Sequence, residues 1–256
     1  MTAPSPSPGP RPRPAAIPPR TVLSRLGRFA VAVDIPPRGW SGAHVWPDTG
    51  VLLSMGRRVR LTARFQAHYA GRTSVAMAVS KEVDHLADAS AARISLGRVA
   101  AHAAAQAIRP ALVSGAIPVV PVDPPADDAE SKVADEVLAA LRAAPQGDDD
   151  PSFRHGGEAA VIMACFKAQK AGGRHIMLAN DGPASKVAAL HGVLTRHAAD
   201  VIAEFACADR TLDADSLKDD FEYACKASKP PADCIPAGPG HFTCRRADDG
   251  TCVRCD

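Results

Sequence analysis

The sequence predicts an α/β protein, and within that class an α/β/α sandwich on a mostly parallel five-stranded sheet. Short apolar segments alternate with amphipathic ones along the chain, which is typical of strands separated by helices. Several apolar segments are followed closely by an acidic residue and the start of a helix, as at the binding edge of open α/β sheets. With 256 residues, of which 46% are hydrophobic, the chain can bury the core of one ordinary domain.

Composition narrows the classes of function. The formal net charge is only +2, so overall charge argues neither for nor against nucleic acid. Aromatic residues make up 4% of the chain, which argues against a base-stacking platform. Since no apolar run approaches the roughly 20 residues of a membrane span, no membrane partner is expected. The N-terminus has no apolar signal-peptide core, so a reducing cytoplasm is the expected location.

The N-terminal region is predicted to stand outside the folded domain. Residues 1–20 are rich in proline and mildly basic, and such a segment can build neither a core nor a hydrogen-bonded ladder, so we expect a disordered arm. Residues 21–44 form an N-terminal extension interrupted by prolines and glycine, whose role the sequence does not define. The main domain is expected over residues 45–210.

The first strand and helix are expected around an acidic residue. The short apolar pair Val45-Trp46 is followed by Asp48, which opens the helix start DTGVLL. A helix is predicted from Val59 to Tyr69, where large apolar side chains recur every four residues.

The next segment is expected to repeat this order. Alternating apolar and small residues over Thr73–Val79 predict a strand, and Ser80-Lys81-Glu82 is interpreted as a cap and first helical turn. Glu82 would then lie just past the end of a strand. An alanine-rich helix is predicted over Ile94–Ala107, and the prolines of Ala116–Val122 confine it to an edge or irregular strand.

The second half of the sequence contains two further candidate acids, Glu158 and Asp181. After an amphipathic helix over Lys132–Ala143, Glu158 lies in the first turn of a helix that ends at Ala171-Gly172-Gly173. His175–Ala179 is short and apolar enough for a buried strand, and Asp181 follows it within a turn. The remaining predictions are helices over Ala184–Leu190, Ala198–Phe205 and Asp213–Ala224, and a last strand at Gly192-Val193-Leu194.

At these positions the chain resembles the PIN-domain nucleases. The motifs that carry the resemblance are DTGVLL at Asp48, VSKEVDHL at Glu82, GEAAVIMA at Glu158 and LANDGPASKVAALHGV around Asp181. Their order and spacing are similar to that family from about Val45 to Phe205. The resemblance implies the five-stranded parallel α/β/α sandwich and an endoribonuclease that cleaves single-stranded RNA with a metal ion. Gly50 departs from the family pattern, in which asparagine is common at this position.

The implied site is a cluster of carboxylates that holds Mg²⁺ or Mn²⁺. Such acids repel one another, and a hard divalent cation with oxygen ligands relieves the repulsion. We expect Asp48, Glu158 and Asp181 as the principal ligands and Glu82 as a ligand or a supporting group. The metal would activate a water molecule for in-line attack on the phosphodiester.

Residues that neighbour these acids in sequence are candidates for substrate binding. Asn180 is expected to orient a water or a phosphate, and Lys81 and Arg154 to hold the RNA backbone. Single-stranded RNA is the expected partner. As the toxin half of a toxin/antitoxin pair the enzyme would also bind an antitoxin, and an RNA-processing nuclease would bind another protein partner or none.

Each acid also has a structural interpretation. Asp48 and Asp181 can serve as helix caps, and Glu158 can simply complement a helix dipole. The alternative function is therefore a PIN-like fold without catalysis that binds RNA or another protein.

The cysteine-rich tail, residues 211–256, contains a candidate zinc site. His241-x-x-Cys244 and Cys252-x-x-Cys255 are two paired half-sites with ligands suited to tetrahedral Zn²⁺. The alternatives are a disordered cysteine-bearing tail and a zinc-dependent nucleic-acid-binding protein with an incidental α/β domain. Cys207, within a helical pattern, is interpreted as an ordinary buried residue.

Overall fold

The computed structural model describes residues 42–89, 95, 98–143, 155–244 and 252. The arm predicted over residues 1–20, and the extension predicted over 21–44 as far as residue 41, lie outside the described residues.

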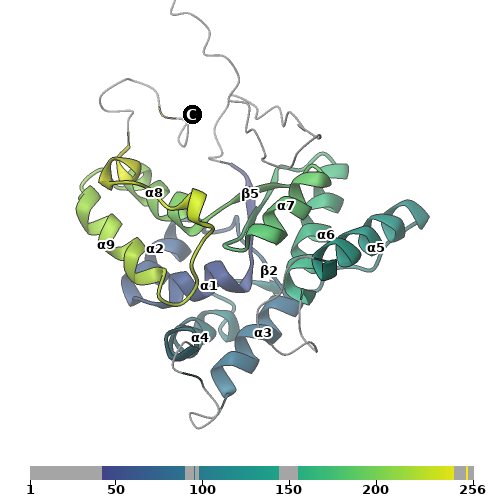
Figure 1. Cartoon of the computed structure of the whole chain (residues 1–256), viewed down its shortest axis with the longest axis horizontal. Coiled ribbons are helices and arrows are strands. Elements are labelled where there is room, and N and C mark those ends of the chain that lie inside the picture. The colour runs from purple at the N-terminus through teal and green to yellow at the C-terminus, as the bar shows by residue number, and fades with distance from the viewer. Residues whose placement is uncertain (1–41, 90–94, 96–97, 144–154, 245–251, 253–256) are drawn as a thin grey trace, which may run out of the picture. The chain divides into compact units, whose positions relative to one another are not determined.

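The α/β class is confirmed, and every strand pair in the described residues is parallel. The strands are β1 (His44–Pro47), β2 (Val75–Ala76), β3 (Val119–Val120), β4 (His175–Leu178) and β5 (Leu194–Arg196). The helices are α1 (Thr49–Gly56), α2 (Val59–His68), α3 (Met77–Asp88), α4 (Val99–Val113), α5 (Asp128–Ala143), α6 (Gly156–Lys170), α7 (Gly182–Leu190), α8 (Ala198–Ala208) and α9 (Ala214–Ala224). Two short 3-10 helices follow, η4 (Ala232–Cys234) and η5 (Pro239–Phe242). Helix α3 packs against α4 and α6, and α8 packs against α9 (Figure 1).

Within the described residues the strands form two small sheets, whereas the sequence predicted one sheet of five. One sheet has three strands in the order β1-β4-β5, and the other pairs β2 with β3. A single parallel bridge between Val45 and Thr73 lies between β1 and the residues that lead into β2. There Val45 N donates to Arg72 O at 2.7 Å, and Ser74 N donates to Val45 O at 3.1 Å.

The strand predicted over Thr73–Val79 is wrong in its second half. Only Val75–Ala76 is extended, and α3 begins at Met77. The helical spacing of Val79, Val83 and Ala87, which are all buried, outweighs the alternation that suggested a strand. Glu82 therefore lies in the second turn of α3 and does not open a helix.

Other predicted elements differ from the structure mainly in their ends. Helix α4 continues through Pro110 to Val113, and α5 begins at Asp128, before the predicted start at Lys132. The last strand begins at Leu194, because Gly192 adopts a left-handed conformation (φ 72°) in the turn that ends α7.

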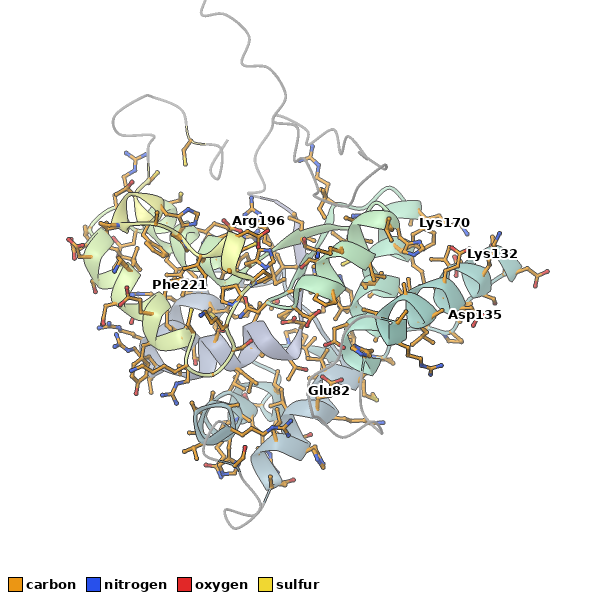
Figure 2. All side chains as sticks on the ribbon, viewed as in Figure 1. Glu82, Lys132, Asp135, Lys170, Arg196 and Phe221 are labelled. Carbon is orange, nitrogen blue, oxygen red and sulfur yellow. The ribbon has the colours of Figure 1, made fainter. Side chains whose placement is uncertain are left out.

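Helix α9 belongs to the folded unit, although the sequence assigned it to the tail. Its buried residues Leu217, Phe221 and Ala224 join the hydrophobic core, and Phe221 is labelled in Figure 2. Farther along the chain, the buried ring of Phe242 in η5 lies with its centroid 5.7 Å from that of Phe221. The chain after residue 210 thus adds to the core.

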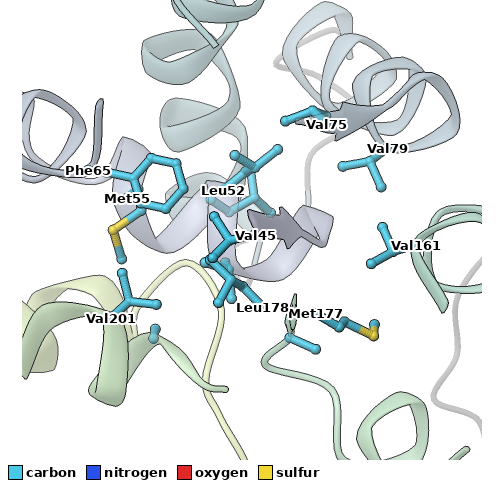
Figure 3. Packing of buried hydrophobic residues seen from close by; sticks show 14 of the residues in the cluster. Val45, Leu52, Met55, Phe65, Val75, Val79, Val161, Met177, Leu178 and Val201 are labelled. Atoms are coloured by element: carbon cyan, nitrogen blue, oxygen red, sulfur yellow. The ribbon is translucent and has the colours of Figure 1, made fainter. Parts of the chain in front are cut away.

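The core lies around the central strands and is mostly aliphatic. Residues from β1 and β4 share one buried cluster with residues from α1, α2, α6 and α8 (Figure 3). The members labelled there are Val45, Leu52, Met55, Phe65, Val75, Val79, Val161, Met177, Leu178 and Val201. Since burying one such large apolar side chain stabilises a fold by about 1.5–3 kcal/mol, this cluster holds β1 and β4, and the acids that follow them, in fixed positions.

Candidate active site

Asp48 and Asp181 lie together at one edge of the three-stranded sheet. Strands β1 and β4 are parallel, with Pro47 paired with Leu178, and Asp48 N donates to Leu178 O at 2.8 Å. Each aspartate caps the helix that follows its strand: Asp48 Oδ1 accepts from Val51 N and Asp181 Oδ1 accepts from Ala184 N, both at 2.6 Å. The predicted order of strand, acid and helix is confirmed at both positions, and both carboxylates meet where the parallel strands end.

Among the four acids predicted for the site, Asp48 is the most deeply buried. It is 3% exposed, and its second oxygen accepts from Asn180 N at 3.2 Å. Burial raises the pKa of Asp48 well above its ordinary value, and the charges of Glu158 and Asp181 raise it further. The backbone N–H groups of Val51 and Asn180 lower this pKa but do not overcome the burial. The site therefore resists a negative charge at Asp48 unless a cation is present.

Glu82 reaches the same region from α3. Its side chain accepts hydrogen bonds from Thr49 Oγ1 and, at 2.9 Å, from Gly157 N. Burial raises the pKa of Glu82 to about 7, and the charge of Glu158 adds to the rise. The two hydrogen bonds lower the pKa, and they fix the carboxylate between the starts of α1 and α6.

Glu158, in the first turn of α6, has one oxygen without a donor. Its Oε2 atom is buried and has no hydrogen-bond partner among the described residues. Burial raises the pKa of Glu158, and Asp181 raises it further. The side chain of His155, whose Nδ1 lies 3.9 Å from Oε2, lowers this pKa. A buried carboxylate oxygen without a donor is costly, and a metal ion would satisfy it.

The four carboxylates interact electrostatically as one group, which we call the acid cluster: Asp48, Glu82, Glu158 and Asp181. Glu158 is its common member, since its charge acts on Asp48 and Glu82 while Asp181 acts on Glu158. Within the described chain, no three acids of this cluster bring a ligand oxygen each within 4.8 Å of the others. The carboxylates would have to draw closer around an ion.

The side-chain amide of Asn180 forms hydrogen bonds with other parts of the protein. It is buried, its Oδ1 accepts from Ala198 N at 3.0 Å, and its Nδ2 donates to Ser54 Oγ at 2.9 Å and to Ser228 O at 3.3 Å. These bonds join the end of β4 to α1, to α8 and to the chain that follows α9. Asn180 therefore positions the backbone that bonds Asp48, and its side-chain amide is hydrogen-bonded within the protein.

Three further residues were singled out in the sequence: Lys81, Arg154 and Gly50. Lys81 is exposed on α3, and Arg154 lies outside the described residues. At Gly50 a Cβ atom would lie 2.7 Å from Ser228 Oγ and 3.3 Å from Asn180 Cβ, so a larger residue there would require the Ser228 side chain to move. The C-terminal chain occupies that space.

A second candidate site consists of cysteine thiols. Cys207, Cys244 and Cys252 place their sulfur atoms within 4.8 Å of one another, close enough to hold a metal ion. Of the zinc ligands predicted from sequence, Cys244 and Cys252 are in this group, whereas His241 is not, and its Nε2 lies 3.5 Å from Asp200 Oδ1. Cys255 lies outside the described residues.

Sequence reasoning missed Cys207 because its helical context suggested a plain core residue. No short ligand spacing links it to Cys244 or Cys252, and only the packing of the C-terminal chain on α8 brings them together. Cys165, by contrast, is a buried core residue.

Comparisons of the chain with family models, with curated proteins and with solved structures gave no match. Within the described residues, no helix combines the length and apolar character needed to cross a membrane.

Proposed function

We propose that the protein is a PIN-like ribonuclease that hydrolyses phosphodiester bonds of single-stranded RNA with Mg²⁺ or Mn²⁺. The observation that carries the proposal is the acid cluster at the ends of β1 and β4. Four carboxylates from four separate parts of the chain gather there, burial and neighbouring carboxylate charges raise the pKa of Asp48, Glu82 and Glu158, and Glu158 Oε2 has no hydrogen-bond donor among the described residues. Such a concentration of mutually destabilised acids is typical of functional sites.

The donor set fits a hard divalent cation. All four side chains offer oxygen, the ligand that Mg²⁺ and Mn²⁺ prefer. Asp48, Glu158 and Asp181 would hold the ion, which when bound polarises a phosphoryl oxygen and lowers the pKa of a water molecule.

The protein groups then have distinct tasks. Glu82, fixed by Thr49 and Gly157, has a pKa of about 7 in the absence of metal and lies near the ligands, where it can accept or release a proton. Asn180 N holds one oxygen of Asp48 in place. Lys81, exposed on the helix that carries Glu82, is the described candidate for a phosphate contact.

The strand arrangement is compatible with this family. We take the two sheets as one interrupted five-stranded sheet in the order β3-β2-β1-β4-β5, because the Val45–Thr73 bridge joins their neighbouring edges. In this interpretation the sheet is interrupted because β2 ends after two residues, where α3 begins.

Cleavage of a labelled single-stranded RNA tests the proposal. Wild-type protein is assayed with Mn²⁺, with Mg²⁺ and with EDTA, beside the variants Asp181→Asn and Asp213→Asn. Both aspartates cap a helix through the N–H three residues on, and asparagine caps equally well. The two variants therefore differ mainly in whether the lost charge belonged to the acid cluster.

We expect metal-dependent cleavage that Asp213→Asn retains and Asp181→Asn loses by more than about 100-fold, since loss of supporting groups alone costs about 10–100-fold at metal sites. Calorimetric Mn²⁺ binding should weaken in parallel. If folded wild-type protein neither cleaves several RNAs nor binds Mn²⁺, the enzyme is excluded and a non-catalytic interaction module takes its place.

A further inference from the structure

We infer that Cys207, Cys244 and Cys252 are three ligands of a structural zinc site that fastens the C-terminal strap, residues 226–244, onto α8. The sequence pattern had pointed to a zinc hairpin confined to the tail. The structure instead takes one ligand from the main domain, and this changes what the metal does.

The spacing of the thiols fits tetrahedral zinc. With Zn–S bonds of about 2.3 Å, a tetrahedral site sets its sulfur atoms about 3.8 Å apart. Cys207 Sγ and Cys252 Sγ lie 3.7 Å apart, and the sulfur of Cys244 lies within 4.8 Å of both. The separation of 3.7 Å is far longer than the about 2.05 Å of a disulfide bond.

The surroundings also favour a bound ion. Cys252 is 4% exposed and the other two thiols are half-buried, so the group is shielded from bulk water. Thiolate ligands select Zn²⁺ over Mg²⁺ and Mn²⁺, so this site and the acid cluster would hold different metals. Cys207 lies in the last turn of α8, where the negative end of the helix dipole favours a cation.

The strap has further contacts that the zinc site would reinforce. Phe242 packs on Phe221 of α9, and His241 lies beside Asp200 of α8. Nearer its start, Ser228 accepts from Asn180 Nδ2 at 3.3 Å, and a Cβ atom on Gly182 would lie 3.2 Å from Pro231 Cγ. The strap therefore runs from the edge of the acid cluster to the thiols, and a metal at its end holds it in place.

Metal analysis of the full-length chain tests the inference. Protein purified under reducing conditions is analysed for zinc, then stripped and titrated with Co²⁺, whose thiolate charge-transfer absorption identifies sulfur ligands. The variants are Cys207→Ser and Cys244→Ser, with Cys234→Ser as the control cysteine in the same strap and Asp181→Asn as the control for metal at the acid cluster.

We expect about one zinc ion per chain and a cobalt–thiolate band in the wild type, in Cys234→Ser and in Asp181→Asn, with both signals lost in Cys207→Ser. Wild-type protein without zinc or a cobalt–thiolate band would overturn the inference even if the cysteine variants do not fold. Retention of both signals by folded Cys207→Ser would overturn it too. Neither result depends on RNA cleavage, so this experiment tests the zinc site independently of the ribonuclease proposal.

Discussion

The raised pKa of Glu82 should make the stability of the metal-free protein depend on pH. The folded pKa is about 7 and the ordinary value is 4.5, so between these values the folded state binds more protons than the unfolded state. The contribution of Glu82 to the free energy of unfolding is therefore fully present below pH 4.5 and is lost as the pH rises through about 7. Because one pKa unit corresponds to about 1.4 kcal/mol, the loss is at most about 3 kcal/mol.

Urea unfolding in EDTA between pH 5 and 8 measures this effect. We expect the free energy of unfolding of the wild type to fall more steeply with pH than that of Glu82→Gln, which cannot ionise there. Saturating Mn²⁺ should reduce the difference, because a cation in the acid cluster favours the charged carboxylate. Equal slopes for wild type and variant would show that Glu82 does not titrate in this range.

Gly157 should be intolerant of any side chain. A Cβ atom there would lie 2.7 Å from both carboxylate oxygens of Glu82, and the same residue donates its N–H to Glu82. Gly157→Ala should therefore displace Glu82, weaken Mn²⁺ binding about 10-fold or more and cost about 1–3 kcal/mol of stability through crowding.

Gly156→Ala is the matched control, because a Cβ atom at the preceding position meets nothing within 4 Å. It should bind Mn²⁺ as the wild type does and unfold at a similar temperature. If calorimetry finds the two variants alike, the close contact between Gly157 and Glu82 is not important for the site.

At the level of helices and strands, the sequence predicts an element well where several local signals agree. The strand β4 and helix α7 were correct because an apolar run, the cap Asp181 and Pro183 in the first turn all indicate the same boundary. Helix α3 lacks a side-chain cap, so nothing local marked Met77 as its start. The sequence placed Glu82 just past the end of a strand, whereas it lies within α3. Its side chain still reaches the acid cluster, because α3 packs against α6.

Helix α9 should depend on Asp220 for its attachment to α2. This carboxylate is fully buried and accepts from Arg58 Nη1 at 2.6 Å, from Arg60 Nε at 2.8 Å and from Arg64 Nη1 at 3.1 Å. Removing one partner of a buried ionic group leaves charge unpaired, so Asp220→Ala should lower the free energy of unfolding by about 3 kcal/mol. Chemical denaturation gives this value directly.

The adjacent Asp219 offers the comparison. It also bonds Arg58, at 2.7 Å, but its side chain is 65% exposed. Exposed ion pairs contribute little, so Asp219→Ala should cost less than about 1 kcal/mol. A similar loss in both variants would mean that charge number, and not burial, governs the attachment of α9.

On the scale of the whole chain, packing decides what local patterns do not show. Asn180 was expected to meet substrate, yet its amide is occupied by Ser54, Ala198 and Ser228, residues far from it in sequence. Cys207 joins its partner thiols for the same reason, since α8 and the C-terminal chain meet only in the folded protein. Both assignments depend on residues beyond position 210, which the sequence placed in a separate tail.

A chain that ends at Arg210 should therefore fail to fold. It would lack the buried side chains of Leu217, Phe221 and Phe242, each worth about 1.5–3 kcal/mol. Their sum is comparable to the 5–15 kcal/mol that separates most folded domains from the unfolded state. Circular dichroism during heating should show no cooperative transition for this chain. A chain that ends at Cys244 keeps all three and should unfold cooperatively. If the chain ending at Arg210 instead melts at the wild-type temperature, the C-terminal region is a separate tail, as its composition first suggested.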